Sequence, residues 1–367
     1  MFGRERNSSN LLQLSLWLTL VCAAAGTTLA ADDWRPPVPP MDRFDWIQLK
    51  SGEWLKGKIK SMQDEKLEFD SEELDLLTFD WEDIRALRSP RLQSVWIEYQ
   101  EPVDGTLWIT TNKVQVISST ETNTYSRAEL LAITPTGKRE VDKWTGKFSA
   151  GLSFREGNTK ETDLNIHASL MRRTPDTRLN LDYLGNYGKV NDEQIEQNHR
   201  FIGQFDYFLS RRLYLRIPDV EYYRDPLQNL AHRVTFGAGV GYDLINTKRI
   251  EWNITASPSF QKNWYDSVPA GESDTENSGA FVLSTEFDFE ITRRLDFILE
   301  YRGQLSRKET GNDAHHIVAT LEFEIHKRLN LDVSFVWDRI SNPQTDTSGV
   351  TPKPDDFRLI TSLGVNF

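Results

Sequence analysis

From Trp144 onward the chain alternates between apolar and polar positions with a period of two. Phe281, Leu283 and Phe287 share one face of such a run. Glu286 and Asp288 lie on the other face. Because successive side chains of a strand point to opposite sides, this pattern predicts strands with one apolar and one charged face. Runs of this kind begin near Trp144, Glu161, Arg178, His199, Leu213, Arg233, Ile250, Ala280, Leu295, His316, Leu329 and Phe357.

The length of these runs favours a membrane-spanning barrel. Most reach the ~9–11 residues that a tilted strand needs to cross a bilayer and exceed the ~5–6 residues of an average soluble strand. A soluble sandwich would not place Glu286, Asp288 and Glu290 at successive inner positions. A closed barrel with a wet lumen and a lipid-facing exterior explains both faces. We therefore predict an all-β chain with a twelve-stranded antiparallel transmembrane β-barrel at 144–367.

The links between runs alternate in length. Short basic or polar links and longer Gly-, Asn- and Asp-rich links follow one another, which is typical of outer-membrane barrels with short periplasmic turns. The short links are 174–176, 210–212, 246–249, 292–294 and 326–328, and the long ones include 188–198, 265–279, 305–314 and 340–356. With an even number of strands, the N-terminal and C-terminal ends of the barrel segment both lie on the periplasmic side.

One run changes face part-way. Leu215 and Ile217 are apolar at odd positions, but Val220 and Tyr222 are apolar at even positions. Pro218 stands at the change, so we predict a β-bulge there.

Aromatic residues gather near the run ends. Their amphipathic rings suit the headgroup level of a bilayer. They are Trp144, Tyr183, Tyr187, Tyr207, Tyr222, Tyr223, Tyr242, Trp252, Trp264, Tyr301 and Trp337. The last residue, Phe367, shares a face with Leu363 and Val365 and resembles the signal that the barrel-assembly machinery of Gram-negative bacteria recognises. We expect Phe367 to be this assembly signal and outer-membrane lipid to surround the barrel.

Residues 41–141 differ from the barrel segment in the length of their apolar–polar runs. They contain short β-type segments, and the stretch 81–87 is similar to 126–133. This similarity predicts a small periplasmic β-domain built as a tandem small-barrel-like repeat. Two functions stay open: a docking or binding module for a periplasmic or cell-wall partner, or a spacer that shields the neck of the barrel.

The first 30 residues have the pattern of a cleaved secretory signal peptide. Arg4 and Arg6 precede an apolar stretch, and small residues follow it. Residues 31–40 form a Pro-rich linker that favours polyproline II geometry. The alternative for 1–30 is an uncleaved anchor helix.

Composition excludes several classes of protein. A net charge of −12 disfavours a nucleic-acid partner. Aromatic residues make up 11% of the chain, which excludes disorder as the main state. A single cysteine excludes a disulfide scaffold and a Cys-based zinc site.

Residues 144–367 resemble a widespread family of uncharacterised outer-membrane barrels often called salt-induced outer-membrane proteins. The resemblance is carried by Trp144-Thr145-Gly146, by residues 153–159 and by the repeated turn pattern at Arg212, Arg294 and Arg328. It implies the barrel fold, an outer-membrane location and a link to the envelope's salt or osmotic response. It implies no substrate.

The predicted inner face is strongly charged. The candidate lumen residues are Glu286, Asp288, Glu290, Asp296, Glu300, Glu322, Glu324, Arg216, Arg233 and Arg302. These acids and arginines either pair across strands and fill the lumen, or leave surplus carboxylates that form a cation-preferring path or binding site. The sequence therefore favours a structural or passive small-solute and ion-permeation role, with a docking module on a closed barrel as the alternative.

Catalysis is the remote alternative. His167 and Ser169 are two residues apart, as in outer-membrane phospholipases, but their register turns them toward the lumen and away from lipid. His315 and His316 are adjacent, so they face opposite sides of a strand and make a poor metal pair. We therefore expect no enzyme, and we assign no cofactor or metal ligand.

Overall fold

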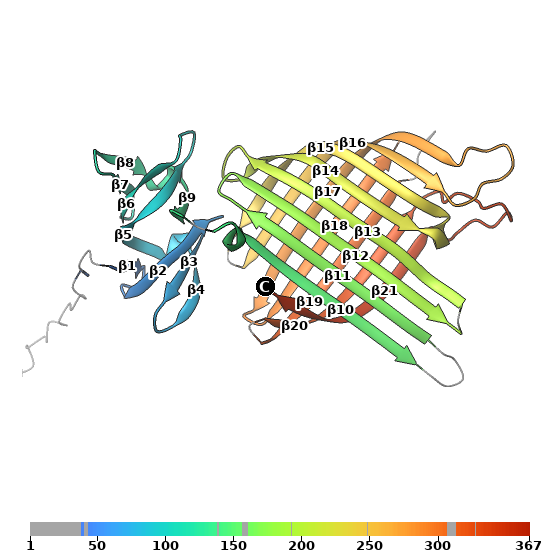
Figure 1. The fold of residues 1–367 in the computed structure, drawn as a ribbon, viewed down its shortest axis with the longest axis horizontal. Coiled ribbons are helices and arrows are strands. Elements are labelled where there is room, and N and C mark those ends of the chain that lie inside the picture. Colours follow the sequence, from blue (N-terminus) through green and yellow to red (C-terminus); the bar gives the residue numbers. More distant parts are fainter. Residues whose placement is uncertain are drawn as a thin grey trace, which may run out of the picture.

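The protein consists of a small β-sheet domain and a large β-barrel (Figure 1). The structure is a computed structural model that describes residues 38–39, 43–137, 139–155, 161–191, 193–247, 249–306, 313–326 and 328–367. The predicted signal peptide and most of the Pro-rich linker lie outside these residues. No helix in the described part of the chain is long and apolar enough to cross a bilayer.

The C-terminal part is a closed antiparallel barrel. Each strand pairs with the next one in the sequence, and the last pairs with the first. The predicted all-β fold with a twelve-stranded barrel is thus confirmed. The strands are β10 (Trp144–Arg155), β11 (Glu161–Arg173), β12 (Thr177–Val190), β13 (Glu193–Phe208), β14 (Leu213–Asp225), β15 (Leu230–Asn246), β16 (Ile250–Tyr265), β17 (Thr275–Thr292), β18 (Leu295–Ser306), β19 (Ala314–His326), β20 (Leu329–Ile340) and β21 (Asp355–Asn366).

The barrel closes between β10 and β21. Residues Lys147–Ala150 pair with Leu363–Asn366, and Gly146 exchanges two backbone hydrogen bonds of 2.9 Å with Phe367. A Cβ on Gly146 would come within 2.6 Å of the Phe367 ring, so the glycine leaves room for the terminal ring against β10. The end of the chain therefore completes the sheet.

The period-two pattern matches the two faces of the barrel. Phe281, Phe335 and Leu359 on the outer face are exposed, and Leu359 is 76% exposed. Val282 and Val336, one residue away in the sequence from two of these, point inward and are buried. A barrel that bares its large apolar side chains on the outside needs an apolar surrounding to cover them.

Two local predictions have different outcomes. The bulge at Pro218 is confirmed, because the pairing of β14 shifts between Arg216 and Asp219. The long link at 188–198 is wrong. There β12 continues to Val190 and β13 begins at Glu193. The polar residues of this stretch still pair as strands, since a strand that extends past an apolar band can be wetted on both faces.

The N-terminal domain is a strongly bent sheet of short strands. Long β5 is shared by its two halves: it pairs with β1 at its beginning and with β9 toward its end. A short 3-10 turn precedes β5, and another precedes β9. The elements are β1 (Asp45–Leu49), β2 (Trp54–Gln63), β3 (Lys66–Ser71), β4 (Asp75–Asp80), η1 (Trp81–Asp83), β5 (Ile84–Ile97), β6 (Val103–Ile109), β7 (Lys113–Ile117), β8 (Thr122–Ser126), η2 (Arg127–Glu129) and β9 (Leu130–Pro135).

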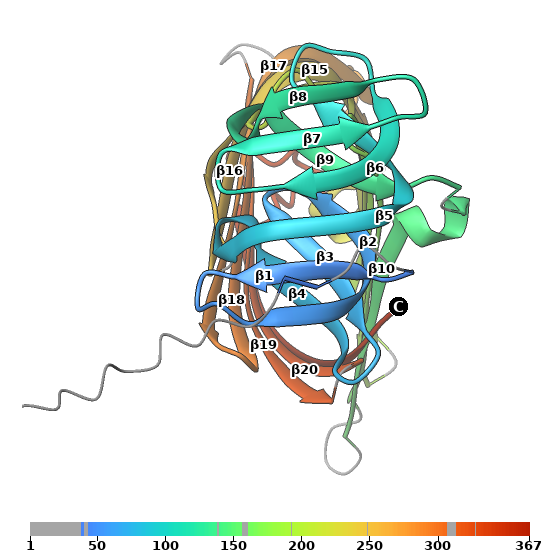
Figure 2. The same ribbon diagram turned by 90° about the vertical axis from the view of Figure 1, so that its left-hand side faces the viewer.

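The domain lies against the short-turn end of the barrel, with β1, β5, β6 and β7 turned away from it (Figure 2). The β2–β3 turn makes the contact. Asp64 accepts a 2.8 Å hydrogen bond from Nε of Arg173 at the end of β11. Glu65 pairs with Arg211 at 3.1 Å, and Lys66 pairs with Glu251. The docked turn therefore carries both signs of charge to the rim.

Candidate functional site

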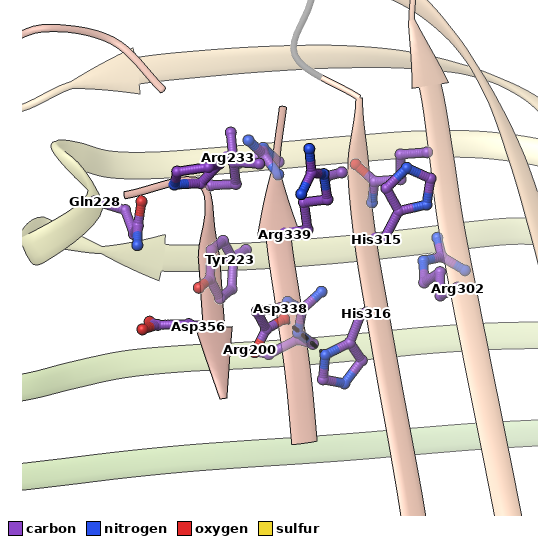
Figure 3. Close-up of a pocket in the computed structure, with 14 residues that line it drawn as sticks. Arg200, Tyr223, Gln228, Arg233, Arg302, His315, His316, Asp338, Arg339 and Asp356 are labelled. Atoms are coloured by element: carbon purple, nitrogen blue, oxygen red, sulfur yellow. Dashed lines mark hydrogen bonds and ion pairs between the residues drawn. The ribbon is translucent and has the colours of Figure 1, made fainter. Parts of the chain in front are cut away.

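A buried ion-pair network crosses the lumen in the half of the barrel distant from the N-terminal domain. Arg200 Nη1 lies 2.5 Å from Glu221 Oε1, and Arg200 Nη2 lies 2.7 Å from Asp338 Oδ1. Figure 3 shows Arg200 beside Asp338, with His316 alongside. We call this set the central network; it comprises Arg200, Asp219, Glu221, Arg302, Asp338 and Arg358.

The network joins opposite walls. Arg200 is on β13 and Glu221 on β14, whereas Arg302, Asp338 and Arg358 come from β18, β20 and β21. Arg302 Nε lies 2.6 Å from Glu221 Oε2. The cavity beside these side chains measures about 20 Å³, which is space for a single water. This cavity is therefore too small for a hydrated ion.

A second buried cluster lies closer to the short-turn end. Asp206 accepts hydrogen bonds from Nε of Arg216 at 2.7 Å and from Nε of Arg178 at 2.9 Å. The ring of Tyr214 stands 4.9 Å from the Arg178 guanidinium. The two arginines share one carboxylate, so Asp206 is held from the neighbouring strands on both sides.

The opposite wall at the same end is acidic. Four pairs of carboxylates are direct cross-strand partners: Glu251 with Asp288, Glu286 with Glu300, Glu290 with Asp296, and Asp296 with Glu322. Like charges in such positions repel and destabilise a sheet. We call the set the acidic wall; it comprises Glu251, Glu286, Asp288, Glu290, Asp296, Glu300, Glu322 and Glu324 on β16–β19.

Two lysines relieve part of this repulsion. Lys147 on β10 pairs with Glu322 and lies 2.9 Å from Asp332. Lys66 comes from the docked turn of the N-terminal domain and pairs with Glu251. The acidic wall therefore gives an electrostatic reason for the domain to sit at this end.

Comparison with known proteins places residues 148–367 in one family. They match the model described as "Protein of unknown function, DUF481". The chain belongs to the DUF481 family. The N-terminal β-domain lies outside the matched residues, and no curated protein matches the sequence.

Solved outer-membrane proteins resemble the DUF481 barrel at low identity. The NanC porin shares 11% identity with a TM-score of 0.35, covering 61% of this chain and 98% of the porin. The β-domain of the Bordetella autotransporter Brka shares 11% identity with a TM-score of 0.30, covering 61% of this chain and 97% of that domain. The channel DcaP of Acinetobacter baumannii shares 14% identity with a TM-score of 0.30, covering 88% of this chain and 94% of the channel.

The predicted lumen residues of the DUF481 barrel fall into two groups. Arg302 belongs to the central network, Arg216 holds Asp206, and Arg233 donates to Asn263 at 3.1 Å. The predicted acids all belong to the acidic wall. Glu322 pairs with Lys147, and Glu286 accepts from Asn253 at 3.2 Å. Asp288, Glu290, Asp296, Glu300 and Glu324 have no ion pair with any described residue.

Sequence reasoning missed Asp219 and the docked turn. Asp219 directly follows the Pro218 bulge, where strand parity does not tell inside from outside, yet it lies 3.1 Å from Arg302 Nη1. Asp64 and Lys66 belong to another domain, so no local pattern points to the barrel. A run of three charged residues, Asp64, Glu65 and Lys66, in one hairpin turn was the available signal.

Three histidines of the DUF481 barrel that the sequence singled out have structural partners. His167 Nε2 lies 2.9 Å from Asp182, and no hydrogen bond among the described residues joins His167 to Ser169. His316 is buried and lies 2.7 Å from Asp338. His315 faces outward, where its ring stacks with Tyr301 and Trp337 at 6.2 Å. The described residues contain no cluster of metal-binding side chains.

Proposed function

We propose that the protein is an outer-membrane β-barrel whose filled lumen makes it an anchor for the N-terminal domain rather than an open pore. A closed barrel leaves no unpaired strand edge, and this one has an apolar exterior, so its lasting environment is a bilayer. The family description assigns no activity, and the proposal rests on the geometry of this chain.

The orientation belongs to the same proposal. The short turns, the start of β10 and the end of β21 all lie on one side of the barrel. In outer-membrane barrels this side faces the periplasm. The N-terminal domain contacts that side through Asp64 and Lys66. The predicted signal peptide would deliver the chain to this compartment, and the barrel-assembly machinery would recognise Phe367.

The central network is the observation that carries the proposal. Removing one partner of a buried ion pair costs about 3–5 kcal/mol, because the other charge is left without compensation. Arg200, Glu221 and Arg302 are each held by more than one partner. Opening the lumen would require several such pairs to separate together.

A planar-bilayer recording tests the filled lumen. We expect the purified protein to show no conductance steps, even at high potassium chloride concentration. The variant Glu221→Ala/Arg302→Ala removes one pair of the network, deprives Asp219 of its arginine and leaves Arg200 with Asp338 alone, and we expect it to conduct intermittently. Steady conductance from the unmodified protein would contradict the proposal.

Cation passage is the second candidate, and the acidic wall favours it. If a path opens beside the central network, surplus carboxylates would prefer cations to anions. Reversal potentials in a salt gradient would then show cation selectivity, and Glu286→Gln/Glu300→Gln would reduce it. Equal passage of both ions would argue against this candidate.

Two broader roles are part of the proposal. One is docking of a periplasmic or cell-wall partner by the N-terminal domain. The other is a contribution to the salt or osmotic response, which comes from the family resemblance alone. A strain with residues 41–141 deleted separates the two roles. If the salt response survives this deletion and is lost only when the barrel is removed as well, the response belongs to the barrel.

A further inference from the structure

A row of aromatic, basic and polar residues crosses the N-terminal sheet. Its strands β1, β5, β6 and β7 lie on the side of the domain turned away from the barrel (Figure 2). Its members are direct cross-strand partners on successive strands β2, β1, β5, β6 and β7. In order they are Lys56, Trp46, Arg88, Trp108 and Gln115. Their sequence neighbours Ile47, Leu87 and Leu107 are fully buried, so the row itself must face outward.

Arg88 is the centre of this surface. Its guanidinium carbon lies 4.9 Å from the centre of the Trp108 ring and 6.0 Å from that of Trp54. No ion pair joins Arg88 to a described residue. A flat cation between two indoles offers stacking area together with unused N–H donors. We call Trp46, Trp54, Arg88 and Trp108 the tryptophan face.

A short piece of the chain already contacts the arginine of the tryptophan face. Arg88 Nη1 donates a 3.2 Å hydrogen bond to the carbonyl oxygen of Pro39. Pro39 is buried, whereas its neighbour Val38 is 60% exposed. Pro39 is therefore covered and held through its carbonyl oxygen, whereas the preceding residue, Val38, is exposed to solvent.

This contact has the chemistry of polyproline recognition. A polyproline II strand makes no internal hydrogen bonds, so its carbonyls are free to accept, and aromatic grooves bind its proline rings. The sequence at 36–40 is Pro-Pro-Val-Pro-Pro, and residues that precede proline are biased toward this conformation. A proline-rich strand fits both the indoles and the arginine of the tryptophan face.

We propose that the tryptophan face is a binding site for a polyproline II strand and that its resident ligand is the chain's own proline segment. Tethering gives such a segment an effective concentration in the millimolar range. A free proline-rich peptide at micromolar concentration therefore cannot displace it. The site thus holds the beginning of the predicted mature chain on the side of the domain that faces away from the membrane.

A binding titration on the full-length protein tests this assignment. The probe is a labelled peptide with the sequence of residues 35–40, followed by fluorescence anisotropy. In one variant Pro36, Pro37, Pro39 and Pro40 are each replaced by Ser, which empties the site. We expect this variant to bind the peptide at least about tenfold more tightly than the parent, whose site is occupied.

Point variants in the emptied protein locate the binding. Trp108→Ala and Arg88→Gln should each weaken peptide binding about tenfold or more, as expected for aromatic and arginine anchors. Trp108 is 42% exposed, so its truncation also removes some packing, and the melting of each variant is recorded beside its peptide binding. Tyr99→Ala is the matched control, because Tyr99 is an exposed aromatic in the β5–β6 link of the same domain.

Three results would overturn the proposal. The first is no peptide binding to the emptied variant. The second is equal binding to the parent and the emptied variant. The third is peptide binding that Trp108→Ala leaves unchanged. Binding of a cell-wall oligosaccharide to the parent without any peptide binding to the emptied variant would identify the face as a glycan site instead.

Discussion

Single residues hold the two halves of the N-terminal domain together. Arg127 on η2 reaches back to η1 and donates to the carbonyl oxygens of Trp81 at 2.8 Å and Ile84 at 2.6 Å. Its guanidinium lies 4.1 Å from the centre of the Trp81 ring. Burial lowers the pKa of Arg127 to about 10, so the side chain stays charged at neutral pH. Arg127 thus donates hydrogen bonds to backbone carbonyl oxygens in the other half of the domain.

We expect Arg127→Met to destabilise the domain by about 1–3 kcal/mol, because two part-buried carbonyls lose their donor. Urea unfolding followed by tryptophan fluorescence measures the change. Arg85→Met is the control, since the Arg85 side chain is exposed on the adjoining strand. Equal effects of the two substitutions would show that the bridge contributes nothing.

A second residue-scale prediction concerns Gly241 in β15. A Cβ at this position would come within 2.1 Å of the Tyr214 ring, which is fully buried and hydrogen-bonded to Thr255. Gly241→Ala must displace that ring, and we expect a loss of about 1–3 kcal/mol. The temperature at which the folded barrel unfolds on a denaturing gel reports the loss. Gly279→Ala should have little effect, because open space surrounds that position.

At the scale of elements, one hairpin turn determines how the domain meets the barrel. Asp64 and Glu65 in the β2–β3 turn both have positive φ values, 51° and 59°, as tight two-residue hairpin turns require. This geometry presents three consecutive charges to Arg173, Arg211 and Glu251. A crevice of about 540 Å³ remains beside the contact, between β9 and the 174–176 link.

A double-mutant cycle with Asp64→Asn and Arg173→Gln measures this contact. We expect a coupling of about 1 kcal/mol, since Asp64 is partly exposed and solvent screens the pair. The distance between spin labels on the domain and on the barrel gives the docked fraction. The exposed pair Lys60–Asp70, which lies within the domain, should show no coupling to docking.

Docking should also depend on pH. Burial alone would raise the pKa of the Asp64 carboxyl, but the neighbouring Arg173 holds it below its ordinary value of 3.8. A lowered pKa means that the docked state gains stability above pH 3.8 and loses it as the pH falls through the lowered value. Spin-label distances should therefore stay constant from neutral pH to about pH 5 and lengthen only under stronger acid. Release near neutral pH would contradict this assignment.

At the scale of the whole molecule, the two ends of the barrel differ in what covers them. The short-turn end carries the N-terminal domain, and the other end carries long links such as 341–354 (Figure 1). The central network lies in the half with the long links, and the acidic wall lies in the half with the domain. The barrel interior therefore carries clustered carboxylates in the half beside the domain and a cross-lumen ion-pair network in the other half.

Cysteine labelling in intact cells checks the orientation. In a Cys22→Ser background, we expect Ser348→Cys on a long link to react with a membrane-impermeant reagent. Tyr99→Cys on the N-terminal domain should react only after the outer membrane is permeabilised. Labelling of Tyr99→Cys in intact cells would place the domain outside and reverse the proposed orientation.

The sequence by itself determined the barrel. The face to which a strand residue points depends only on its position in the strand, so alternation in one dimension reports the two sides of each strand and the number of crossings. It also located the Pro218 bulge, because an inserted residue changes the parity of all that follow. Strand ends such as Glu193 were misplaced, since parity carries no signal where both faces are wet.

Only the tertiary structure decided which charges meet. Arg200 and Asp338 are 138 residues apart, and their contact depends on barrel closure and on the stagger of strands that no local pattern encodes. The docking of Asp64 on Arg173 likewise depends on how two separately folded parts come together. Ion pairing depends on distances in space, whereas the period of two is a property of the backbone itself. The sequence therefore predicts the architecture of this protein more directly than its charged site.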